Sequence, residues 1–161
     1  AILIFYLLMN NASPFSYVLT DPWDAMSEPF GAYNSDIAMG NCVYVKSIPG
    51  RRIPEWSVGL EILPDYVRKA FKSVFDYDAK SYREKISSRP TAVDWQYVLH
   101  RFFSEELEIC EKNKNHGYMK KYSGECPFCK ARRNADGEFG DLLDSDDGGS
   151  LSLWLESRRG S

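Results

Sequence analysis

The stretch "SRPTAVDWQYVLHRFFSEEL", residues 88 to 107, carries the helical signal that decides the fold class of this chain. Thr91 is followed three residues later by Asp94, which resembles a capping box with Asp in place of the preferred Glu or Gln. Apolar side chains then recur at helical spacing, and these are Trp95, Val98, Leu99, Phe102 and Leu107. The pattern predicts a long final helix of about five turns with one buried face.

A second amphipathic segment lies upstream, in "LPDYVRKAFKSVFDYDAK". Its apolar residues also recur at helical spacing, with charged residues between them; they are Tyr66, Val67, Ala70, Phe71, Val74 and Phe75. We therefore expect an amphipathic helix of about three to four turns whose aromatic stripe belongs to the core.

The chain opens with nine apolar residues, "AILIFYLLM", which are too few for a membrane span of about 20 residues. They predict a buried helix, and we expect the chain to start inside a domain whose core covers that helix on all sides. Asn10 and Asn11 can adopt the left-handed conformation that ends a helix, and Pro14 prevents its continuation.

Residues 16–63 give weaker signals. Asp21 and Pro22 are suited to open a short helix, and "CVYVKSI", residues 42–48, predicts a short strand or an extended loop. Cys42 and His100 stand alone in the sequence, where core or surface packing is the more frequent role for either residue.

Composition restricts the class of protein further. The chain has 161 residues, 43% of them hydrophobic, which is enough for one globular domain with a real core and excludes a wholly disordered protein. Four cysteines are too few for a small disulfide scaffold, and no segment resembles a signal peptide. We therefore expect a cytoplasmic protein, with no membrane partner, in which cysteines bind metal rather than form disulfides.

Charge is unevenly distributed along the chain. The net charge is -3, yet residues 134–161 hold seven acidic residues against two arginines, which leaves residues 1–133 at about +2. Gly, Ser and Asp dominate this last segment, so we expect a flexible acidic tail there. Its one apolar island, "LSLWL", suits either a docking patch or a plain disordered tail.

Three pieces of the sequence together resemble the C-terminal lobe of bacterial serine/threonine protein kinases. They are "LIFYLLMNNASPF" for the end of the central helix, "VRKAFKSVF" for a later helix and "SRPTAVDW" for the start of the last one. The resemblance covers residues 1–107 and implies a mainly α fold, a partial kinase C-lobe. Asn11 stands where the family usually has glycine, a substitution that the left-handed tolerance of Asn permits.

The resemblance also implies a function for a longer parent protein, which would transfer phosphate from ATP, with Mg²⁺, to serine or threonine of a protein substrate. The chain contains no "H-R-D", "D-F-G" or "V-A-I-K" segment, so no catalytic or ATP-binding residue is assigned and we expect this fragment to be inactive alone. The implied partners are the upstream kinase N-lobe and catalytic segment. Arg89 would form the buried ion pair that kinases make with the glutamate of the A-P-E segment; the alternative is a solvent-facing arginine before a helix cap.

Residues 110–130, "CEKNKNHGYMKKYSGECPFCK", hold a second kind of signal. Four potential metal ligands follow the spacing C-x5-H-x9-C-x2-C, and they are Cys110, His116, Cys126 and Cys129. Zinc prefers four nitrogen or sulfur ligands in a tetrahedron, and two cysteines separated by two residues suit a zinc knuckle. We predict a structural zinc site in an appendix formed by residues 108–133, with Cys110 at the end of the last helix and the ligand atoms within about 4 Å of one another.

Three other interpretations of this segment remain. A thioredoxin-like redox pair would need C-x-x-C at a helix N-terminus after a strand in a βαβ unit. A nucleic-acid-binding zinc module is favoured by the basic residues and by Tyr118, Tyr122 and Phe128, which could stack on bases. A free-standing, zinc-stabilised interaction module is the third.

The kinase resemblance extends into this segment. One group of bacterial kinase-like proteins follows its last helix with a "C…H-x-Y…C-P-aromatic-C" arrangement. The residues that match it are Cys110, His116, Tyr118, Cys126, Pro127, Phe128 and Cys129. The sequence thus predicts three parts: residues 1–107, a partial kinase C-lobe; 108–133, a zinc-binding appendix; and 134–161, an acidic tail.

Overall fold

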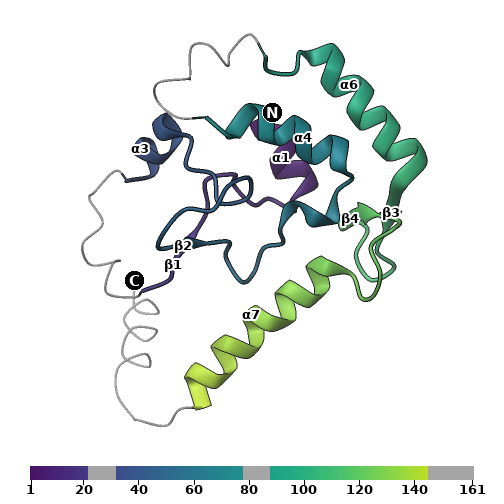
Figure 1. The fold of residues 1–161 in the computed structure, drawn as a ribbon. Helices are drawn as coiled ribbons and strands as arrows, with labels where there is room; N and C mark the ends of the chain where they lie inside the picture. Colours follow the sequence, from purple (N-terminus) through teal and green to yellow (C-terminus); the bar gives the residue numbers. More distant parts are fainter. Residues whose placement is uncertain (22–31, 78–87, 145–161) are drawn as a thin grey trace, which may run out of the picture.

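The computed structural model describes residues 1–21, 32–77 and 88–144 (Figure 1). Its helices are α1 (Ile2–Leu8), α3 (Ala32–Met39), α4 (Asp65–Phe75), α6 (Ala92–Arg101) and α7 (Pro127–Asp144), with a 3-10 turn at Leu60–Ile62 and a π-helical turn at Phe102–Glu106. Two small antiparallel sheets pair β1 (Val18–Leu19) with β2 (Arg51–Arg52) and β3 (Leu107–Ile109) with β4 (Gly117–Met119). The predicted mainly α class is confirmed in the described part of the chain.

The N-terminal helix is present as α1, and only one of its faces is covered. Phe5 and Leu8 are buried, whereas Leu3 and Leu7 expose 76% and 77% of their surface. Asn10 and Asn11 have φ angles of 50° and 67°, so the predicted left-handed end of this helix is confirmed. The outer face of α1 thus carries apolar side chains into solvent, and the expectation that the core of a longer domain covers this helix on all sides stays a prediction.

Aromatic rings hold α1, α4 and α6 together. Phe5 is fully buried, and its ring lies 5.2 Å from that of Phe71 and 5.8 Å from that of Phe75, both in edge-to-face contact. Phe71 also lies 5.1 Å from Trp95 on α6. Such pairs add about 0.5–1.5 kcal/mol each beyond the area that they bury, so this cluster is the centre of the helical part.

Helix α6 begins as predicted but ends early. The backbone N–H of Thr91 donates to the carboxylate of Asp94 at 2.8 Å, and the N–H of Asp94 donates to the Thr91 hydroxyl at 3.3 Å, which completes the capping box. The predicted five turns are wrong, because the α-helix stops at Arg101 and Leu107 already lies in β3.

Competing hydrogen bonds explain the early end of α6. Ser104 donates its hydroxyl to the carbonyl of His100, and Lys120 donates its N–H to the carbonyl of Glu106 and its Nζ to that of Glu105. The carbonyls of Glu105 and Glu106, in the π-helical turn that follows α6, thus bond to Lys120, and residues 107–109 pair with β4 instead of extending the helix.

Two weaker predictions concern residues 42–48 and a short helix opening at Pro22. Residues 42–46 form a turn, in which the N–H groups of Val45 and Lys46 both donate to the Cys42 carbonyl, so the predicted alternative of a strand is wrong. The helix expected at Pro22 lies outside the described residues. A buried ion pair not predicted from the sequence joins Asp36 of α3 to Arg51 of β2.

Helix α7 continues to Asp144, where the sequence predicts a flexible tail from residue 134. No proline interrupts this stretch, and Pro127 starts the helix at the position that proline tolerates best. The expectation of disorder is therefore not met by residues 134–144, while residues 145–161 and their "LSLWL" island lie outside the described part. None of the helices within the described ranges has both the length and the apolar character needed to cross a bilayer.

One continuous core runs from α1 into the cysteine-containing segment. Residues of that segment belong to the same buried cluster as Phe5 and Phe102, and they are Cys110, Tyr118, Cys126, Phe128 and Ala131. The metal-ligand segment is therefore packed onto the helical part and shares its core.

Candidate metal centre

A β-hairpin brings the first two candidate ligands together. In the β3–β4 ladder, Leu107 pairs with Met119 and Ile109 with Gly117, so Cys110 and His116 occupy the next opposed position. The N–H of Cys110 donates to the carbonyl of His116 at 3.0 Å, which extends the ladder by one step. Opposed residues of antiparallel strands carry side chains on the same face of the sheet. The C-x5-H spacing thus places a thiol beside an imidazole, and the expectation that Cys110 ends a helix is wrong.

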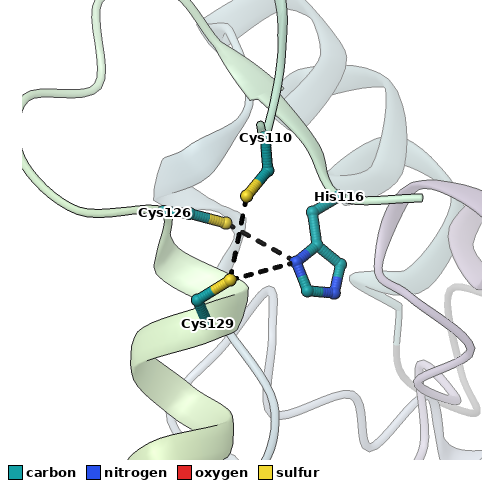
Figure 2. A group of neighbouring side chains, drawn as sticks. All are labelled: Cys110, His116, Cys126 and Cys129. Atoms are coloured by element: carbon teal, nitrogen blue, oxygen red, sulfur yellow. Dashed lines mark hydrogen bonds between the residues drawn. The ribbon is translucent and has the colours of Figure 1, made fainter. Parts of the chain in front are cut away.

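The other two ligands lie at the start of α7. Cys126 immediately precedes Pro127, the first residue of the helix, and Cys129 lies in the first helical turn. The N–H of Lys130 donates to the Cys126 carbonyl at 3.0 Å, which fixes Cys126 against the helix end. Figure 2 shows both sulfur atoms turned toward His116 and Cys110.

The distances among the four side chains suit a tetrahedral ion. All four ligand atoms lie within 4.8 Å of one another, and Cys110 Sγ is 3.8 Å from Cys129 Sγ. His116 Nδ1 is 3.6 Å from Cys126 Sγ and 3.5 Å from Cys129 Sγ. A tetrahedron with zinc–sulfur bonds of about 2.3 Å and a zinc–nitrogen bond of about 2.0 Å has edges of about 3.8 Å between sulfurs and 3.5 Å between sulfur and nitrogen. The predicted convergence is confirmed, although the largest separation exceeds the expected 4 Å.

Protonation at the centre also favours metal ligation. Burial acts to raise the pKa of the Cys110 thiol, but hydrogen bonds from the backbone N–H groups of Asn113 and Lys112 hold it below the ordinary value. Burial raises the pKa of Cys126 to about 11, so at neutral pH a bound cation is needed to stabilise its thiolate. Burial and the nearby Arg132 lower the pKa of His116, which keeps the imidazole in the neutral form that binds metal.

The aromatic residues of the segment pack around the ligands. The ring of Phe128 lies 5.1 Å from the imidazole of His116, and Tyr118 contacts Tyr122 edge-to-face at 6.0 Å. Phe128 and Tyr118 expose only 5% and 9% of their surface. These two rings are part of the core and are not available to stack on nucleic-acid bases.

The C-x-x-C pair does lie at a helix N-terminus, which the redox interpretation requires. The strand before it, β4, belongs to an antiparallel hairpin, and the sheets in the described ranges are all antiparallel. The βαβ context of a thioredoxin-like pair is therefore absent from those ranges, and His116 and Cys110 complete a four-ligand set instead.

Arg89 is half-buried and lies away from this centre. Its guanidinium is 5.4 Å from the centre of the Tyr77 ring, and it lines two cavities of about 620 and 490 Å³ beside Ala1 of the N-terminal segment. A fully solvent-facing arginine, the alternative considered from the sequence, does not describe this position.

The remaining cysteine and histidine do not join the centre. Cys42 is fully buried in the helical core, where burial raises the pKa of its thiol to about 11, and His100 is exposed on α6.

Asn113 is a residue of the centre that the sequence does not single out, although its amide lies 3.1 Å from His116 Nε2. The Asn-rich turn between two short β-prone runs was the signal that could have revealed the hairpin.

Comparison of the chain with protein-family models, curated proteins and solved structures found no match.

Proposed function

We propose that residues 108–133 hold one structural zinc ion through Cys110, His116, Cys126 and Cys129. The observation that supports this most directly is the convergence of three sulfurs and one imidazole nitrogen from a hairpin and a helix end. Soft thiolate ligands with an imidazole favour zinc over magnesium or calcium, which prefer oxygen.

Full protein ligation supports a structural role over a catalytic one. Catalytic zinc sites keep one position open for water or substrate, whereas structural sites close all four. Cys110, His116 and Cys126 are each less than a tenth exposed, so substrate access to an ion among them would be poor. The ion would tie the hairpin to α7.

Thermal unfolding of the reduced, metal-depleted protein tests this function. Because an ion that binds only the folded state stabilises it, micromolar Zn²⁺ should raise the melting temperature, while millimolar Mg²⁺ should not. Equal effects of the two ions, or no effect of either, would contradict a zinc site.

We further propose that residues 1–107 are the C-lobe portion of a serine/threonine protein kinase-like protein. Support comes from the three quoted sequence pieces and from the exposed apolar face of α1, where Leu3 and Leu7 are more than three-quarters exposed. A catalytic segment packing on this face would cover it, and a glutamate on that segment would reach Arg89 at the adjacent cavities.

In this proposal, the parent protein binds ATP, Mg²⁺ and the protein substrate, and it contains the N-lobe. We place it in the reducing cytoplasm, where cysteines remain available to zinc.

The reading frame before Ala1 in the gene provides the test. Segments of the "H-R-D" and "D-F-G" type in that frame are the expected result. A start codon at Ala1 would overturn the kinase proposal and favour a free-standing, zinc-stabilised interaction module.

A further inference from the structure

Asn113 lies in the hairpin turn and contacts both ligands of the hairpin. Its backbone N–H donates to the sulfur of Cys110, and its carbonyl accepts the N–H of His116 at 3.0 Å. Its side-chain Oδ1 accepts the N–H of Asn115 at 3.0 Å, and its Nδ2 lies 3.1 Å from His116 Nε2. One half-buried residue is thus joined to two of the four ligands.

The direction of the imidazole decides what Asn113 must do. His116 Nδ1 is the nitrogen that faces the sulfurs of Cys126 and Cys129, so an ion among the ligands binds Nδ1. The ring hydrogen then resides on Nε2, which becomes a donor and needs an acceptor. Asn113 supplies that acceptor if its amide rotates by about 180° and places Oδ1 where Nδ2 lies.

We infer that Asn113 is the positioning residue of this centre, holding His116 with Nδ1 toward the ion by accepting a hydrogen bond from Nε2–H. The inference rests on the proposed zinc function. The ring of Phe128 packs against the imidazole of His116, with 5.1 Å between the ring centres, and limits how far the imidazole can tilt. The hydrogen bond to Asn113 then fixes which ring nitrogen faces the ion.

If Asn113 has this role, zinc binding should change the hydrogen bonds within the hairpin turn. While Oδ1 faces Asn115, it accepts the N–H of that residue; after rotation it accepts from His116 instead. Binding of zinc should therefore release the Asn115 N–H to solvent, and its hydrogen exchange should become faster although the rest of the hairpin becomes better protected.

Four variants, measured in the full chain, separate positioning from packing. Asn113→Leu keeps the backbone contacts and removes the acceptor, so we expect zinc affinity, measured against a chromophoric chelator, to fall roughly 10- to 100-fold. Asn113→Asp should retain tight binding, because a carboxylate accepts from His116 and from Asn115 at once. Asn115→Leu and Asn115→Asp are matched controls for size and for added negative charge, since Asn115 is exposed.

Cobalt spectra of the same variants report which ligand is affected. In Asn113→Leu the sulfur-to-cobalt charge-transfer bands of three thiolates should persist, while the ligand-field bands change because the imidazole is no longer held. Binding by Asn113→Leu as tight as by Asn115→Leu would overturn the inference, as would equal losses in Asn113→Leu and Asn113→Asp.

A measurement on the unaltered chain avoids any folding defect of a variant. Long-range ¹H–¹⁵N spectra of the zinc-loaded protein should place the ring hydrogen of His116 on Nε2 and the metal on Nδ1. Metal on Nε2 would overturn the role of Asn113 while leaving the zinc site intact. A chain that binds no zinc at all would overturn the proposed function together with this inference.

Discussion

The thiols of Cys110 and Cys42 are both buried, but their pKa values are shifted in opposite directions. Burial acts to raise the pKa of the Cys110 thiol, but hydrogen bonds from backbone N–H groups and from neighbouring thiols hold it below the ordinary value. At Cys42, burial outweighs the hydrogen bonds from the backbone N–H groups of Tyr44 and Val45 and raises the pKa to about 11. The local fold therefore prepares one cysteine as a ligand and leaves the other as a core residue.

Cysteine substitutions should divide into two classes. Cys110→Ser and Cys129→Ser should each remove most of the bound zinc, because a tetrahedral site needs both halves. Cys42→Ser should keep full zinc content and lower the free energy of unfolding by roughly 1–3 kcal/mol, since it buries a hydroxyl in the core. Metal analysis measures the zinc content of the three variants, and urea unfolding measures the stability of Cys42→Ser. Loss of zinc from Cys42→Ser would contradict the assignment of Cys42 to the core.

The two faces of α1 should respond differently to truncation. Phe5→Ala should lower the free energy of unfolding by about 3–5 kcal/mol, because Phe5 is fully buried among aromatic rings. Leu7→Ala, on the exposed face, should change it by no more than about 0.5 kcal/mol. Urea denaturation of both variants decides this, and similar losses would indicate that the outer face of α1 is covered in solution.

Residue chemistry made the four ligands predictable, but it could not reveal Asn113. Thiol and imidazole groups at metal-site spacing are recognisable in sequence, since few other roles need them together. The part played by Asn113 depends on which residues the hairpin turn brings within hydrogen-bond reach, and that follows only from the strand register.

Elements were predictable where one periodic pattern dominated. Helix α4 and the start of α6 follow directly from apolar spacing and the Thr91–Asp94 box. The end of α6 does not follow from the sequence, because Phe102 and Leu107 continue the helical spacing although residues 107–109 pair with β4. Three-residue strands carry too little alternation to compete with a helical pattern in the sequence.

Substitution of Thr91 tests whether its hydroxyl stabilises the N-terminus of α6. Thr91→Ala should lower the free energy of unfolding by about 1 kcal/mol, because the N–H of Asp94 loses its acceptor, while Thr91→Ser should keep the cap. Equal losses for the two variants, measured by urea denaturation at neutral pH, would show that the hydroxyl is not the stabilising group.

Acid should remove the carboxylate half of the same cap. Hydrogen bonds from the Thr91 side chain and then from its backbone lower the pKa of Asp94 below 3.8. A carboxyl whose folded pKa lies below its unfolded pKa contributes stability that is fully present above pH 3.8 and is lost as the pH falls through the folded value. The difference in stability between the unaltered chain and Asp94→Asn should thus shrink as the pH falls below 3.8; a constant difference would contradict the box.

At the scale of the whole molecule, the sequence suggested a small separate zinc core, and the structure describes a continuous one. Cys110, Tyr118 and Phe128 belong to the same buried cluster as Phe5 and Phe71. Long-range packing of this kind leaves no local pattern in the sequence. Yet the aromatic centre around Phe5 contains no metal ligand, so the two ends of the core should differ in their dependence on zinc.

Removal of metal should therefore loosen one end of the molecule first. With a strong chelator under reducing conditions, hydrogen exchange should speed up in β3, β4 and the start of α7, because a two-stranded hairpin is marginal without a partner. Protection in α1 and α4 should remain, since their aromatic contacts persist. Simultaneous loss of protection in all these elements would contradict a local role for the ion.

X-ray absorption at the zinc edge, on protein purified under reducing conditions and carrying about one equivalent of zinc, tests the central claim most directly. The ion should show three sulfur neighbours at about 2.3 Å and one imidazole nitrogen at about 2.0 Å, the set that Cys110, Cys126, Cys129 and His116 supply. A first shell of oxygen atoms, or protein that takes up no zinc while these residues stay ordered, would contradict it.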